Sequence, residues 1–88
     1  MEIDDIRSQI DEIDKQLLPL FEQRLALCLA VGREKQALGR PLYDWTRELR
    51  KIRVLRESAA PETADAVAGI FKSLISLCRQ YEVDVLEK

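Results

Sequence analysis

The 88-residue sequence contains no histidine, and it has few glycines, prolines and aromatic residues. The absence of histidine excludes imidazole acid–base catalysis and the usual zinc sites. Its two cysteines, Cys28 and Cys78, lie among apolar neighbours and fit neither a disulfide framework nor a metal-ligand spacing. No signal peptide is recognisable, and no apolar run approaches the length of a membrane span. We therefore expect a cytoplasmic protein.

What remains is a composition typical of helices, because aliphatic residues are abundant whereas Gly and Pro are sparse. The 14 basic and 16 acidic residues give a net charge of −2, which provides no general signal for nucleic acid or a membrane surface. The charges are unevenly spread, since residues 2–14 hold six acids and one Arg, whereas Arg47–Arg56 holds five bases and one acid. The simplest interpretation of both segments is a solvated helix face. The length fits one small domain, residues 1–88.

The apolar periodicity predicts an all-α fold of three helices, one long and two shorter, over about residues 4–38, 45–60 and 63–85. Gly39 marks the end of the first helix. Pro19 lies inside that helix and predicts a kink at about residues 15–18. Asp44 or Thr46 is suited to cap the second helix, and Thr63 to cap the third.

An apolar stripe with the alternating three- and four-residue spacing of a buried helix face runs along the first 38 residues. Two cations interrupt it. Arg24 occupies the position that continues the series after Leu20, and Lys35 lies eleven residues further on, within about 20° of the same face. Burying a charge is costly unless it is paired, so the pattern favours an anionic partner. The stripe consists of Ile3, Ile6, Ile10, Ile13, Leu17, Leu20, Leu27, Val31 and Leu38.

The first helix is too long for a compact domain of this size. At about 1.5 Å per residue it is on the order of 50 Å long, whereas the domain diameter is expected to be roughly 30 Å. Two short helices cannot cover such a stripe, so we expect a second copy of the chain to cover it in a homodimer. Arg7 lies about 25 Å from Arg24 along the axis, so it can join Arg24 at one ligand only across a dimer interface.

Further charged residues are expected near Arg24 and Lys35. Asp44, Arg47 and Glu48 lie at the start of the second helix, where free backbone N–H groups favour an anion. Cys78 and Glu82 lie four residues apart on one face of the third helix. A pocket formed by these residues is rich in cationic groups and has no nucleophile–base pair, so it suits a small dicarboxylate.

The order and spacing of these residues form a specific pattern, namely Ile6-Arg7-x-x-Ile10-Asp11-x-Ile13-Asp14-x-x-Leu17-Leu18, then Arg24, Val31, Lys35, Pro41 and Asp44-x-x-Arg47-Glu48. The pattern resembles the all-helical chorismate mutase family, and the resemblance extends over nearly the whole chain. It implies an intertwined homodimer of three-helix protomers. The implied reaction is the pericyclic rearrangement of chorismate to prephenate, in phenylalanine and tyrosine biosynthesis, without a cofactor or metal.

The resemblance also implies a role for each matching residue. Arg24 and Arg7 from the partner chain would bind the enolpyruvyl carboxylate, while Arg47 would bind the ring carboxylate. Lys35 would donate to the ether oxygen, which gains negative charge as the C–O bond breaks. Such a reaction needs no acid, base or nucleophile, because catalysis comes from confining the substrate and from cations aimed at developing charge.

Four further positions complete the implied site. Glu48, with the backbone near Asp44, would hold the ring hydroxyl. Cys78 and Glu82 stand where many family members have Ser and Gln. Cys78 is either a weak S–H donor to the ring carboxylate or simply a small buried residue. Glu82 must be protonated to donate to the ether oxygen; burial raises a carboxyl pKa and the nearby Lys35 lowers it, so its protonation state stays open here.

Two other classes of function remain open. One is a sister enzyme on the same scaffold, either an isochorismate pyruvate-lyase or an aminodeoxychorismate mutase, although Glu48 suits a ring hydroxyl and so favours chorismate. The other is a non-catalytic helical dimer that acts as an interaction module. The basic run Arg47–Arg56 is its supporting feature, and it predicts salt-sensitive binding to nucleic acid without chorismate turnover. The leading interpretation predicts chorismate as the ligand, and neither nucleic acid nor a membrane as a partner.

Overall fold

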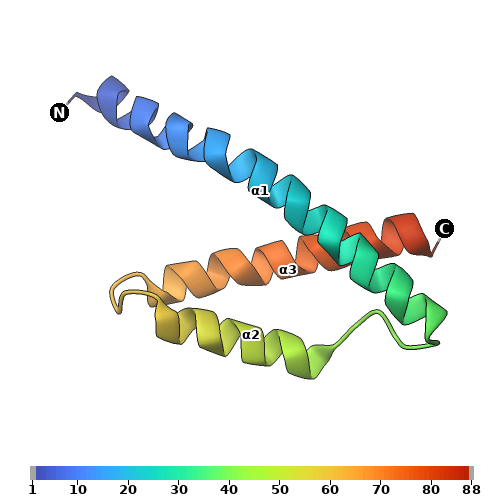
Figure 1. Ribbon diagram of the computed structural model, residues 1–88. Helices are drawn as coiled ribbons and strands as arrows, with labels where there is room; N and C mark the ends of the chain where they lie inside the picture. Colours follow the sequence, from blue (N-terminus) through green and yellow to red (C-terminus); the bar gives the residue numbers. More distant parts are fainter. Residues whose placement is uncertain (1, 88) are drawn as a thin grey trace.

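The computed structural model describes residues 2–87, in which three α-helices are joined by two short connections (Figure 1). α1 spans Ile3–Ala37, α2 spans Trp45–Ser58 and α3 spans Ala64–Leu86. The predicted all-α fold with one long and two shorter helices is confirmed, and each predicted boundary is within two residues of the observed one. α3 packs against both α1 and α2, whereas among the described residues the α1 backbone does not approach α2.

α1 is far longer than the region in which α3 supports it. The molecule extends 54 Å along its longest axis and only 15 Å along its shortest, and the N-terminal half of α1 projects away from the other helices (Figure 1). The apolar stripe on this helix is largely exposed, with Ile3 at 66% and Leu27 at 67% of their full accessible area. Among the described residues only Leu29, Ala68 and Cys78 are buried apolar side chains. The chain by itself therefore leaves most of its apolar stripe uncovered.

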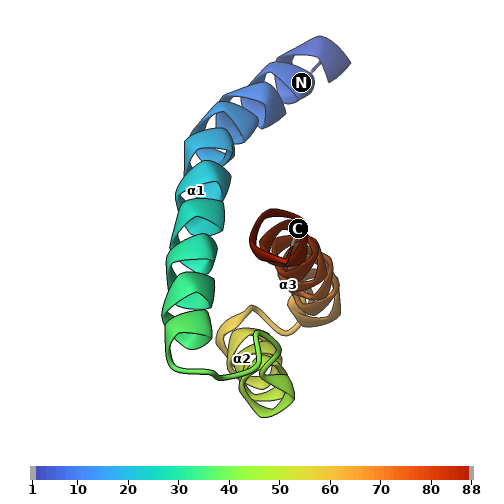
Figure 2. The same ribbon diagram turned by 90° about the vertical axis from the view of Figure 1, so that its right-hand side faces the viewer.

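Pro19 lies inside α1 without ending it. The helix is continuous from Ile3 to Ala37, and it bends in its N-terminal half (Figure 2). A proline removes one backbone donor and clashes with the preceding turn, which is a recognised cause of helix bending. α1 thus remains one element that joins the projecting segment to the part packed on α3.

The C-terminal end of α1 is closed by a Schellman motif. Arg40 N–H donates to the Lys35 carbonyl at 2.8 Å, and Gly39 N–H donates to the Gln36 carbonyl at 3.1 Å. Gly39 has φ +66°, a left-handed conformation that disfavours residues with a Cβ. After this turn the connection runs back to the start of α2, which lies below α3 in this view (Figure 1).

Gly32 allows the close approach of α1 to the end of α3. A Cβ at this position would lie 2.5 Å from Leu86 Cδ1 and 3.6 Å from Glu82 Oε2. The glycine costs helix propensity, but here its missing side chain leaves room for both α3 residues.

The two shorter helices begin differently. Asp44 is the N-cap of α2, and its side chain accepts a hydrogen bond from Arg47 N–H at 3.0 Å, so the first of the two predicted caps is the one used. Thr63 is the N-cap residue of α3 as predicted, but its hydroxyl donates to the Ala60 carbonyl and makes no bond to the helix. No helix within residues 2–87 is long and apolar enough to cross a membrane.

Candidate active site

A cavity of about 460 Å³ lies between the C-terminal half of α1, the start of α2 and the second half of α3. Its volume is within the range typical of small-molecule sites. Seven of the eight residues predicted for the site line this cavity, and Arg7 does not, because it lies exposed on the projecting part of α1. The seven are Arg24, Lys35, Asp44, Arg47, Glu48, Cys78 and Glu82.

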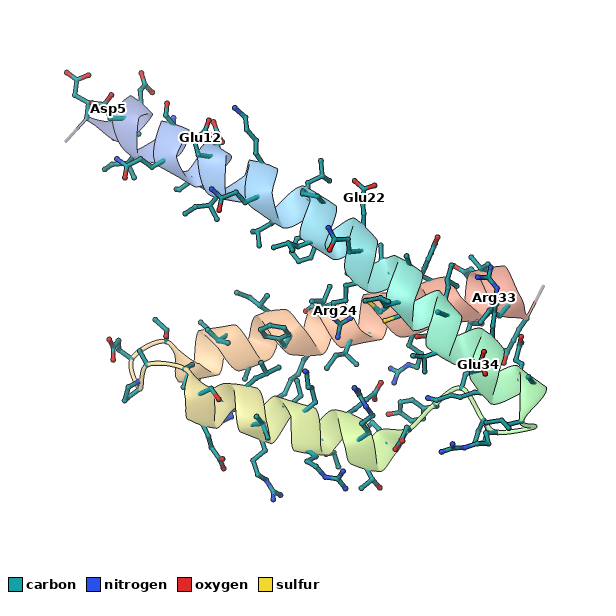
Figure 3. The ribbon with its side chains drawn as sticks, viewed as in Figure 1. Asp5, Glu12, Glu22, Arg24, Arg33 and Glu34 are labelled. Atoms are coloured by element: carbon teal, nitrogen blue, oxygen red, sulfur yellow. The ribbon has the colours of Figure 1, made fainter. Side chains whose placement is uncertain are left out.

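Arg24 points from α1 toward α3, whereas Glu22 points away from the other helices (Figure 3). Arg24 Nη1 donates to Cys78 Sγ at 2.8 Å and lies 3.8 Å from Cys28 Sγ. Cys78 is only 3% exposed, so the bond from Arg24 to its sulfur is shielded from water. Burial raises the pKa of the Cys28 thiol to about 11, which keeps that thiol neutral in the physiological range.

Lys35 connects the end of α1 to the segment that leads into α2. Its Nζ donates to the Leu42 carbonyl at 2.9 Å. An ammonium group has three donors, so this bond leaves others available to a ligand in the cavity. The side chain is half-buried, which reduces the screening of its charge by water.

The start of α2 contributes both signs of charge. The capping bond to Asp44 fixes the backbone at Arg47, whose side chain lines the cavity. Glu48 follows at the next position and accepts from Arg79 Nη1 of α3, at 3.1 Å to Oε2 and 3.4 Å to Oε1. The Arg79 guanidinium carbon lies 4.2 Å from the centre of the Tyr43 ring, within range of a cation–π contact.

Glu82 has a raised pKa. Burial is the largest cause, and the Glu48 charge adds to it; the Lys35 ammonium, a hydrogen bond with Cys28 and the Arg24 guanidinium act in the opposite direction. The net shift is upward from the ordinary value of 4.5. Desolvation thus outweighs the attraction of two cations, and a protonated Glu82 is favoured at higher pH than a free carboxyl would allow.

The lining of the cavity is cationic overall, with six bases and three acids. Cations in a partly enclosed cavity attract a dianion, and arginines bind carboxylates through two parallel hydrogen bonds. No group of three His, Cys, Asp or Glu side chains within residues 2–87 lies close enough to hold a metal ion. The bases are Arg24, Lys35, Arg40, Arg47, Lys51 and Arg79, and the acids are Asp44, Glu48 and Glu82.

Sequence reasoning missed four of the lining residues that bear polar or charged groups. Cys28 could have been found, because it lies four residues after Arg24 and so on the same face of α1. Lys51 follows Arg47 by the same interval on α2. Arg79 could also have been found, because it lies three residues before Glu82 on α3, whereas Arg40 gave no signal, since it lies in a turn.

Together the three helices and the cationic cavity define a small all-helical protein with a site suited to an anionic ligand. The sequence profile of the family described as chorismate mutase type II matches residues 6–83 of the chain. The chain therefore belongs to the chorismate mutase type II family.

Several named proteins are similar to the chain. A chorismate mutase of Methanocaldococcus jannaschii is 33% identical over 86 residues, which cover 96% of this chain and 87% of that protein. A T-protein of Haemophilus influenzae is 36% identical over 70 residues, or 77% of this chain and 19% of the T-protein. An intracellular chorismate mutase of Mycolicibacterium smegmatis is 30% identical over 64 residues, which cover 73% of this chain and 62% of that protein. The chain thus spans about a fifth of the T-protein and most of the archaeal enzyme.

Proposed function

We propose that the protein is a chorismate mutase, which rearranges chorismate to prephenate in phenylalanine and tyrosine biosynthesis. The observation that supports this most strongly is the cationic cavity with residues from all three helices, in a chain of the chorismate mutase type II family. A cytoplasmic location is part of the proposal, and the name of the mycobacterial relative supports it.

In this proposal the cations bind and orient the substrate. Arg24 and the partner's Arg7 bind the enolpyruvyl carboxylate, and Arg47 binds the ring carboxylate. Lys35 and protonated Glu82 donate to the ether oxygen as the C–O bond breaks. These two donors act on charge that develops in the transition state, so they raise the rate and not only the affinity.

The proposal requires an intertwined homodimer, because Arg7 lies outside the cavity of its own protomer. The exposed apolar stripe of α1 is the surface that a second copy would cover. Full burial of one Leu or Ile side chain contributes about 1.5–3 kcal/mol, so a stripe of this length provides a large driving force for association.

The test measures the loss of chorismate absorbance with the purified protein. Isochorismate is assayed in parallel, and light scattering gives the oligomeric state. We expect chorismate turnover by a dimer and little turnover of isochorismate. Release of pyruvate from isochorismate as the main reaction would identify the protein as a lyase. Salt-sensitive binding to nucleic acid without chorismate turnover would identify it as an interaction module.

A further inference from the structure

Arg79 on α3 links two other elements at the wall of the cavity. It donates to the Glu48 carboxylate of α2 at 3.1 Å, and it lies against the Tyr43 ring of the α1–α2 connection. The Tyr43 ring in turn packs on Trp45 at the start of α2, with 5.3 Å between ring centres. The Arg79 side chain is 35% exposed and that of Glu48 is 21% exposed. The ion pair is thus partly shielded from water, and the Tyr43 ring packs against its Arg79 side chain.

This ion pair determines which ligand groups can donate hydrogen bonds to Glu48. An ionised carboxylate has about four acceptor positions, and the single Arg79 donor leaves some of them available. The carboxylate is held in place before a ligand arrives, so a neutral hydroxyl finds a positioned acceptor. An ammonium group at the same point would gain less, because Arg79 already balances the charge of Glu48 and would repel a second cation.

We propose that Arg79 is a positioning and specificity-determining residue, which holds Glu48 for a neutral ring hydroxyl and disfavours a substrate with an amino group at that ring carbon. This inference rests on the proposed function and deepens it. An amino group is largely protonated at neutral pH, so the two substrates differ by one positive charge at the point that Arg79 faces.

The experiment compares chorismate with aminodeoxychorismate in the wild-type protein and in Arg79→Gln, Arg79→Lys and Arg33→Gln. Arg33 is exposed on α1 and outside the cavity, so its variant is the matched control for losing one arginine. We expect Arg79→Gln to raise the ratio of kcat/KM for the amino substrate over chorismate roughly tenfold, the size of one charge-assisted hydrogen bond at a partly exposed site. Arg79→Lys keeps the positive charge and should keep most of the wild-type preference.

The division between KM and kcat separates positioning from a general structural effect. The ring hydroxyl does not react, so a weaker hydrogen bond from this hydroxyl to Glu48 should appear mainly as a higher KM for chorismate. A variant that merely distorts the site would lower kcat for both substrates alike and leave their ratio unchanged. That result, with an active wild type, overturns this inference and leaves the proposed function intact. No turnover of either substrate by the wild type overturns the proposed function and this inference with it.

Discussion

Replacing Glu82 with Gln tests the most unusual part of the site. The raised pKa of Glu82 makes the protonated carboxyl available as a donor, whereas its ionised form would repel the ether oxygen of the substrate. Gln is a donor at every pH and has nearly the same shape. We therefore expect the wild-type rate to fall as pH rises through the Glu82 pKa, and the Glu82→Gln rate to stay level.

The size of the effect follows from the titration. Above the pKa, each further pH unit reduces the protonated fraction about tenfold, so log kcat/KM of the wild type should approach a slope of about −1. The Glu82→Gln variant should then exceed the wild type at the alkaline end of the range. The assay is chorismate absorbance at a series of pH values at constant ionic strength. Glu22→Gln is the matched control, because Glu22 points away from α3 on an exposed face (Figure 3).

The pH dependence of stability provides an independent test of the raised Glu82 pKa. The folded state binds the Glu82 proton more tightly than the unfolded state, whose carboxyl titrates near the ordinary value of 4.5. The free energy of unfolding should therefore decrease as pH rises from that value to the raised pKa, and Glu82→Gln should remove this part of the pH dependence. A wild-type rate that is independent of pH from the acid to the neutral range would refute the reasoning.

Two further predictions concern the cations. Lys35→Ala should lower kcat about 10²–10³-fold, because it removes a donor aimed at the developing charge; near-normal turnover by a folded dimer would contradict this role. Arg7→Ala and Arg24→Ala should each be nearly inactive. Unfolding them together at equal amounts and refolding the mixture should restore about a quarter of the wild-type activity, since half of the dimers then contain one intact site. No gain on mixing, with heterodimers detected by mass spectrometry, would exclude a site shared between protomers.

Much of the fold was predictable from local features. The three helices follow from apolar periodicity, and their ends follow from Gly39, Asp44 and the proline that comes after the second helix. Arg24 and Lys35 stood out because charges within an apolar stripe need a partner. Helical spacing puts Arg79 one turn before Glu82, but it does not predict the contacts of Arg79 with Glu48, 31 residues earlier, and with Tyr43.

Helical geometry converts spacing directly into direction, so the sequence was enough to predict that α1 extends beyond the rest of the chain and that Arg24 and Lys35 face a common side. How these charges are balanced depends instead on the packing of the three helices. The pKa of Glu82 depends on how deeply α3 packs against α1 at Gly32, and Glu48 is paired only because α2 and α3 lie side by side. Desolvation and ion pairing depend on distances between segments far apart in the chain, which no local pattern specifies.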